Sequence, residues 1–160
     1  MMMHNWFTCK IRYEKTLENG MNKKVTEPYL VDALSFTEAE SRIIEEMTPF
    51  FQGEFVVAGV ARANYEEIFP SDEECADRWY KCKLWFMTLD EKTGVEKRTA
   101  SNVLVQASDL RDAIKKLDEG MKGTLADYVI ASVSETAIMD VYPYEADHDV
   151  KPEFNDADRR

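Results

Sequence analysis

The sequence has few of the residues that mark the commonest kinds of catalytic site. It has only two histidines, His4 and His148, which argues against histidine-based acid–base catalysis and zinc binding. Its six glycines form no glycine-rich phosphate loop and no Walker motif. Three cysteines without a CxxC pair, behind a start that does not have the pattern of a signal peptide, indicate reduced thiols. We therefore expect no cofactor, no metal site and no enzymatic activity.

Long apolar runs are also missing. No segment approaches the roughly 18 consecutive apolar residues that a membrane helix requires, so we expect no membrane partner and a cytoplasmic location. Apolar residues still make up 44% of the 160 residues, which is enough to form a core. The net charge is −11, but residues 1–27 and 75–102 are mildly basic and the rest is acidic. Such a protein is repelled by nucleic acid unless a local basic patch overrides its overall field.

What the sequence does contain is an internal repeat. The segment WFTCKI at 6–11 recurs as WYKCKL at 79–84, and LVDA at 30–33 recurs as LVQA at 104–107. Over about 65 aligned positions there are about 15 identities, where chains of average composition would share roughly four. Such self-similarity predicts an internal duplication. The expected organisation is repeat 1 at 5–70, an acidic linker at 71–78, repeat 2 at 79–143 and an acidic tail at 144–160, all within one compact domain.

Each repeat has the pattern of a β-β-α-β unit. Apolar residues alternate along the opening strands, and a capping box at 35–38 and an aspartate cap at Asp109 precede helical stripes. Runs at 54–63 and 127–136 favour further strands, with a bulge or bend near Gly59 and Ser132 and with short continuations toward a proline. We therefore predict an α+β fold with one continuous antiparallel sheet, two helices on one face and a pseudo-twofold axis. Two sheets packed together are the alternative.

The clearest candidate site is the face of the opening strands that points away from the helices. Tryptophans alternate there with cations, and the neighbouring strand adds one cation in each repeat. Aromatic rings beside cations on an open sheet can stack nucleic-acid bases and hold phosphates. We therefore predict a binding protein for single-stranded nucleic acid or a nucleotide. The predicted ligand-binding residues are Trp6, Lys10, Arg12, Lys24, Trp79, Lys81, Lys83, Trp85 and Arg98.

Other interpretations stay open. The tryptophans could cover a second core layer or a dimer interface, because tryptophan is highly buried on average. The acids at 38–46 and 72–74 could instead engage a basic host protein, as an inhibitor or a nucleic-acid mimic. The repeated acids Glu67 and Asp140 more often end a strand than bind a metal, and no acidic cluster has a metal-loop spacing. The sequence does not indicate an oligomeric state.

Three tracts together resemble a known family. They are the WFxCK opening, LVDALSFTEAESRI and VVAGVARANYEEIFP, and the likeness covers most of residues 5–143. The chain is similar to a small family of uncharacterised proteins, a domain of unknown function, from gut anaerobes and their phages and mobile elements. The resemblance implies a cytoplasmic accessory protein of a phage or mobile element. It implies no catalytic residue, so no site residue is taken from it.

Overall fold

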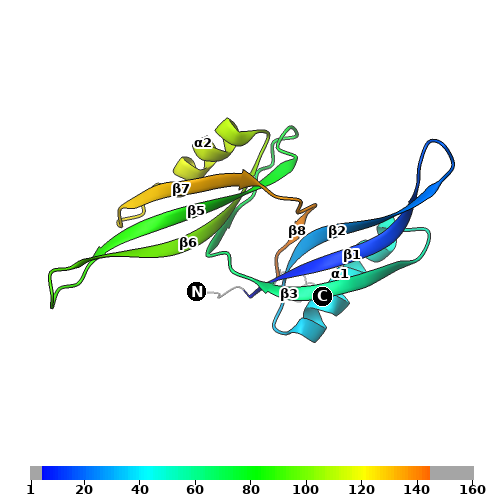
Figure 1. Cartoon of the computed structure of the whole chain (residues 1–160), viewed down its shortest axis with the longest axis horizontal. Helices are drawn as coiled ribbons and strands as arrows, with labels where there is room; N and C mark the ends of the chain where they lie inside the picture. The colour runs from blue at the N-terminus through cyan, green and yellow to red at the C-terminus, as the bar shows by residue number, and fades with distance from the viewer. Residues whose placement is uncertain (1–4, 145–160) are drawn as a thin grey trace, which may run out of the picture. The chain divides into compact units, whose positions relative to one another are not determined.

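The computed structural model describes residues 5–144, which form an α+β protein with two helices and eight strands in two sheets (Figure 1). The chain divides into two compact units. Of the described residues, 5–62 and 141–144 form the first unit and 63–140 form the second. Of the tail predicted at 144–160, residues 145–160 lie outside the described residues, as do His4 and His148.

The first unit is a four-stranded sheet with one helix on one of its faces (Figure 1). The strands lie in the order β3-β1-β2-β8, and β1 and β2 form a long antiparallel hairpin. Gly20 at the tip of this hairpin has a φ of 84°, a conformation that glycine adopts without strain. The elements are β1 (Trp6–Thr16), β2 (Asn22–Asp32), α1 (Phe36–Met47), the 3₁₀ turn η1 (Thr48–Phe50), β3 (Phe55–Ala63) and β8 (Val141–Tyr142).

The second unit has the corresponding strand order and also carries one helix. Its strands lie in the order β4-β6-β5-β7, and β5 and β6 form the long antiparallel hairpin. A register shift between Lys83 and Leu84 places Ser132 opposite Lys83 and Ile130 opposite Leu84, which confirms the irregularity predicted near Ser132. The elements are β4 (Glu67–Phe69), β5 (Arg78–Leu89), β6 (Glu96–Ala107), α2 (Leu110–Gly120) and β7 (Tyr128–Glu135).

Both helices begin as their sequences predict. The Ser35 hydroxyl accepts a hydrogen bond of 3.1 Å from the Glu38 backbone N–H, and the Glu38 carboxylate accepts one of 2.8 Å from Leu34 N–H. In α2 the Asp109 carboxylate accepts from Asp112 N–H at 2.8 Å. Each helix then turns one apolar stripe toward its sheet. The buried stripe residues are Ala39, Ile43 and Met47 in α1 and Ala113, Leu117 and Met121 at α2.

The inward faces of the opening strands form the cores. Phe7, Cys9 and Ile11 of β1 are fully buried in the first core, and Cys82 and Leu84 of β5 are fully buried in the second. The period-two pattern thus correctly predicted which face packs on the helices. Neither helix within residues 5–144 combines the length and apolar character needed to cross a membrane.

The prediction of one continuous antiparallel sheet is wrong. The chain forms two separate sheets, and each ends in a parallel pair, β2 with β8 and β4 with β6. The two shortest strands explain why the sequence did not predict this arrangement. β4 has three residues and pairs with β6, and β8 has two residues and pairs with β2. Strands this short have no sequence periodicity that would indicate their partners.

The unit boundaries also differ from the predicted repeats. β4 falls within the predicted repeat 1 but pairs with β6, so it belongs to the second unit. The predicted acidic linker then lies inside the second unit, between β4 and β5, and ends at Asp77 because Arg78 already pairs with Ala107. As a result, the second unit is continuous in sequence, whereas the first unit takes its edge strand β8 from a distant part of the chain.

Candidate functional site

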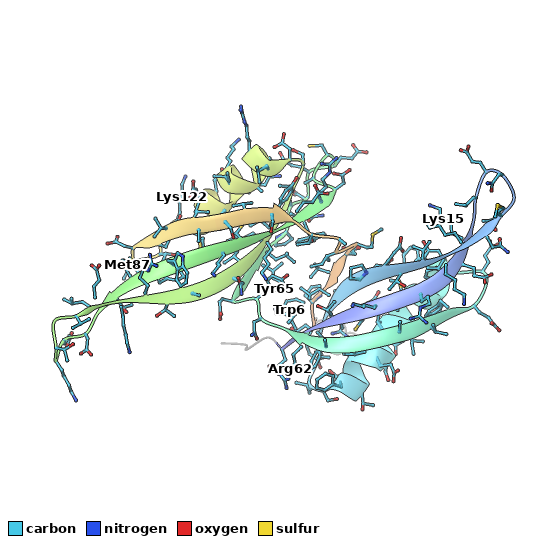
Figure 2. The ribbon with its side chains drawn as sticks, in the orientation of Figure 1. Trp6, Lys15, Arg62, Tyr65, Met87 and Lys122 are labelled. Carbon is cyan, nitrogen blue, oxygen red and sulfur yellow. The ribbon has the colours of Figure 1, made fainter. Side chains whose placement is uncertain are left out.

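The helix-free face of β5 gathers four of the predicted ligand-binding residues, which we call the Trp85 surface: Lys81, Lys83, Trp85 and Arg98. Lys81, Lys83 and Trp85 alternate on β5, so their side chains share one face, opposite to the core residues Cys82 and Leu84. Arg98 lies on β6, paired with Met87 two residues beyond Trp85. Figure 2 labels Met87 and so marks this part of the hairpin.

Both neighbouring cations lie over the Trp85 ring. The Lys83 Nζ is 4.7 Å from the ring centroid, and the guanidinium carbon of Arg98 is 4.8 Å from it. These distances fall within the range of cation–π attraction, which is strongest for tryptophan. Trp85 and Lys83 are half-buried, whereas Lys81 and Arg98 are exposed. The surface therefore joins a partly open indole to positive charge.

The strands on either side of β5 present small or polar residues to this face. Trp85 lies between Ala100 of β6 and Val129 of β7, and Val129 is 52% exposed. The register also places Asn102 and Ser132 on either side of Lys83. The amide and hydroxyl groups of Asn102 and Ser132 can hydrogen-bond to a ligand. The sequence alone did not indicate Asn102 and Ser132, because only the strand register brings them next to β5.

The cations of the Trp85 surface are not neutralised by carboxylates. Within residues 5–144, Lys81, Lys83 and Arg98 take part in none of the salt bridges. The ion pairs that do occur in the second unit join other residues, Arg78 with Asp77 and Glu135 and Lys116 with Glu73 and Asp112. An unpaired cluster of three cations in an acidic protein is a local attraction for an anion.

Trp6 and Trp79 do not belong to an open surface, contrary to the prediction. They lie at the beginning of β1 and β5, but their side chains are only 5% and 3% exposed. Trp79 also accepts two hydrogen bonds at its carbonyl oxygen, from the N–H and the hydroxyl of Thr136, both at 2.9 Å. The large apolar area of an indole favours burial over exposure on a strand. The alternation of residues along the strand assigned both tryptophans to the correct face of the sheet, but it does not indicate whether that face is exposed to solvent.

The predicted cations of the first unit are exposed, but they lack an aromatic partner. Lys10, Arg12 and Lys24 all lie on the β1–β2 hairpin. Aligning Trp6 with Trp79 makes Arg12 the counterpart of Trp85, so this hairpin has a cation where the other has an indole. Arg12 and Lys24 line a shallow cavity of about 640 Å³ together with Asn22, Glu14 and Glu54. The two carboxylates make this cavity less attractive to an anion than the Trp85 surface.

The two core cysteines are inert thiols. Burial raises the pKa of Cys9 to about 11, with a further contribution from the charge of Glu40. Burial alone raises the pKa of Cys82 to about 11. Both side chains are 0% exposed, as predicted, whereas Cys75 is exposed. A thiol with such a high pKa is a poor nucleophile at neutral pH.

A cation on each helix contacts the chain that follows the short edge strand. Lys116 of α2 donates to Ser71 Oγ at 3.1 Å and pairs with Glu73 and Asp112. Arg42 of α1 donates to the Pro143 carbonyl at 3.2 Å, and its guanidinium carbon lies 5.4 Å from the Tyr144 ring centroid. The sequence could have indicated these two residues, because Arg42 and Lys116 occupy the same position of the two helices. A comparison that counts only identical residues does not detect this pair.

The repeated acids do not form a metal centre. Glu67 and Asp140 are both exposed; Glu67 is the first residue of β4 and pairs with Val103, whereas Asp140 directly precedes β8. Within the described chain, no three His, Cys, Asp or Glu side chains lie close enough together to hold a metal ion. We therefore assign no ligand set to these carboxylates.

Comparison with known proteins gives a family but no activity. No curated protein matches the chain. The model of one protein family, described as a domain of unknown function (DUF4494), matches residues 5–144, which is the whole of the part described above. The chain therefore belongs to the DUF4494 family.

Proposed function

We propose that this protein is a non-enzymatic binding protein that holds single-stranded nucleic acid or a nucleotide on the Trp85 surface. The single observation that carries the proposal is the half-buried indole of Trp85 with Lys83 and Arg98 both within 5 Å of its ring centroid. A base that stacks on the indole would take the place of a cation over the ring, and the displaced cation would then hold the phosphate. The site predicted on the opening strands of both repeats is thus confined to the second unit, because Trp6 and Trp79 are buried.

The charge distribution supports the same ligand class. The net charge of −11 repels polyanions in general, whereas the β5–β6 hairpin carries Lys81, Lys83 and Arg98 without carboxylate partners. A polyanion is therefore drawn to this hairpin rather than to the rest of the surface.

The proposal includes an origin for the two units. We infer that they arose by internal duplication around a pseudo-twofold axis, since their strand orders correspond and the same residue types recur in their cores. The family resemblance further leads us to propose an accessory protein of a phage or mobile element that acts in the cytoplasm.

Fluorescence titration tests the proposal directly. Trp85 is the only one of the three tryptophans that is partly open, so stacking of a base on it should quench a selective part of the emission. An oligothymidylate should bind. A plot of log K against the logarithm of the salt concentration should have a slope of about −2, because each of three phosphate contacts on a single strand contributes about −0.7. Trp85→Ala removes the reporting indole, so its affinity is measured by the fluorescence anisotropy of a dye-labelled oligothymidylate; it should be weaker by about 1–3 kcal/mol, the value of one stacked base.

Two variants serve as matched controls. Phe50→Ala removes an aromatic side chain that is 74% exposed in the first unit, and Lys122→Ala removes an exposed cation after α2. Neither should alter binding if the Trp85 surface is the site. Equal affinity of the parent and of a folded Trp85→Ala/Lys83→Ala double variant would refute the proposal.

The second candidate is an acidic module that engages a basic host protein. Glu40 and Glu45 of α1 and Asp72 before β5 are exposed and available for such a partner. Glu38 and Glu73 are less available, because they contact Leu34 N–H and Lys116. Failure to bind any oligonucleotide at low salt, together with binding to a basic protein that Glu40→Lys/Glu45→Lys abolishes, would favour this candidate.

A further inference from the structure

The edge strand of the first unit is supplied from the far end of the described chain. β8 pairs in parallel with β2, with Val141 opposite Leu30 and Tyr142 opposite Val31. The Tyr142 ring stacks on Tyr29 with a centroid distance of 6.2 Å. Arg42 then binds the segment after the strand through the Pro143 carbonyl. Without this strand the edge of β2 would have unpaired backbone groups.

The second unit has the same arrangement but supplies the strand itself. β4 pairs in parallel with β6, with Ile68 opposite Leu104 and Phe69 opposite Val105. Lys116 binds the segment after this strand, as Arg42 does in the first unit. The two inserted strands have the same pattern of an acid, a β-branched residue, an aromatic residue and proline: Glu67-Ile68-Phe69-Pro70 and Asp140-Val141-Tyr142-Pro143.

The inserted strands β4 and β8 differ in how they are connected to the rest of the chain. β4 continues through residues 70–77 into β5 of its own unit. β8 is instead reached from β7 through residues 136–140, which join one unit to the other. Each inserted strand therefore follows the last long strand of the preceding unit, and the final one returns to the first unit of the chain.

From this connectivity we infer that two copies of this chain associate by exchanging their β8 strands. This inference goes beyond the proposed nucleic-acid binding and does not depend on it. If β8 enters the first unit of a second copy, every contact inside each unit is kept, including the pairing with β2, the Tyr29 stacking and the Arg42 hydrogen bond. Only the path of residues 137–140 changes, and reciprocal exchange closes a symmetric dimer.

The connecting segment is suited to such a change of path. Its anchor is Thr136, held to the Trp79 carbonyl, and Ile138 N–H donates to the Thr136 hydroxyl at 3.2 Å. Ala137, Met139 and Asp140 are exposed. A segment with few buried side chains can adopt a second path at low cost. The binding partner is thus the β8 strand of a second copy, and its site is the edge of β2.

Paired cysteines show whether β8 pairs with β2 of its own chain or with β2 of a second copy. In a Cys75→Ser background, Leu30→Cys/Val141→Cys places two thiols at facing positions of β2 and β8. Exchange between copies converts this pair into a disulfide-linked dimer on a non-reducing gel, in a fraction that rises with protein concentration. The matched control is Leu104→Cys/Ile68→Cys, at the same register of the second unit, which should cross-link only within one chain because β4 and β6 belong to one continuous unit.

Light scattering on the unmodified full chain provides the second measurement. The expected result is a species of twice the monomer mass that increases with concentration. Monomer mass at every concentration, or a Leu30/Val141 disulfide that always stays within one chain, would overturn the inference. A dimer of the correct mass whose Leu30/Val141 disulfide is intramolecular would also overturn it, because the copies would then meet through another surface.

Discussion

The ring of Phe69 packs against the backbone of Gly120, so that a Cβ atom built on Gly120 would lie 2.7 Å from the nearest ring carbons. Phe69 belongs to β4, and Gly120 is the last residue of α2. The contact fixes the inserted strand of the second unit under the end of its helix. Glycine is required here by close approach rather than by a positive φ.

Gly120→Ala should therefore destabilise the second unit. The methyl group forces the Phe69 ring to move, and overpacking of this kind costs about 1–3 kcal/mol, more than the helix gains from alanine. Urea denaturation measures the change in the free energy of unfolding. Gly53→Ala is the control, because no atom lies within 4 Å of its added Cβ. Equal stability of the Gly120→Ala variant and the parent would show that the ring relaxes freely.

The carboxylate of Asp112 should make stability depend on acid pH. The Ser108 backbone N–H, followed by Lys116, lowers the Asp112 pKa below its ordinary value of 3.8. Because the folded pKa is the lower one, the stabilisation is present above the ordinary value and is lost as the pH falls below it. Asp112→Asn should therefore flatten this part of the pH profile in urea titrations, whereas Asp72→Asn, at an exposed position, should not. Parallel profiles for the parent and Asp112→Asn would contradict the assignment.

The thiols should differ sharply in reactivity. At pH 8 a thiol reagent should modify Cys75 at once, and Cys9 and Cys82 only after denaturation, since both are buried with a pKa of about 11. Their folded pKa values exceed the ordinary 9.0, so the fold should lose stability as the pH rises from 9 toward 11. Mass spectrometry after timed labelling counts the modified cysteines. Rapid labelling of all three in the folded protein would be incompatible with the described cores.

Truncation should separate the two units. A chain that ends at Met139 loses β8, so the β2 edge opens and the amides of the first unit should exchange hydrogen faster. Amides of β6 should be unchanged, because β4 is retained. A chain that ends at Tyr144 keeps β8 and is the control. Hydrogen exchange followed by mass spectrometry measures both units in one sample, and equal protection of β2 in the two truncated chains would mean that β8 adds nothing to the first unit.

Lys116 should hold the segment between β4 and β5. Burial lowers the Lys116 pKa, but the hydrogen bonds and charges of Glu73 and Asp112 outweigh burial and raise it overall. Lys116→Met keeps the apolar stem and removes these contacts, so protease cleavage within residues 71–77 should become faster. Lys115→Met, next to it and exposed, is the matched control. Unchanged cleavage of Lys116→Met would show that the segment is held by other contacts.

Local structure could be predicted from the order of the residues. Alternation in 6–13 and 79–86 identified the core face of the opening strands, and the caps and stripes identified both helices, because these patterns depend on neighbours within a few residues. Strand pairing, in contrast, depends on the folded chain. The partners of β4 and β8 are set by contacts far away in the sequence, and two or three residues carry too little pattern to specify them.

The candidate site divides in the same way. The residue types of the Trp85 surface were evident in the sequence, since an indole alternates with lysines on one strand face. Register alone brought Arg98 over the ring and placed Asn102 and Ser132 beside Lys83. The burial of Trp6 and Trp79 was likewise decided by the folded chain, because a period of two assigns a side chain to a face of the sheet, whereas packing determines whether that face meets water.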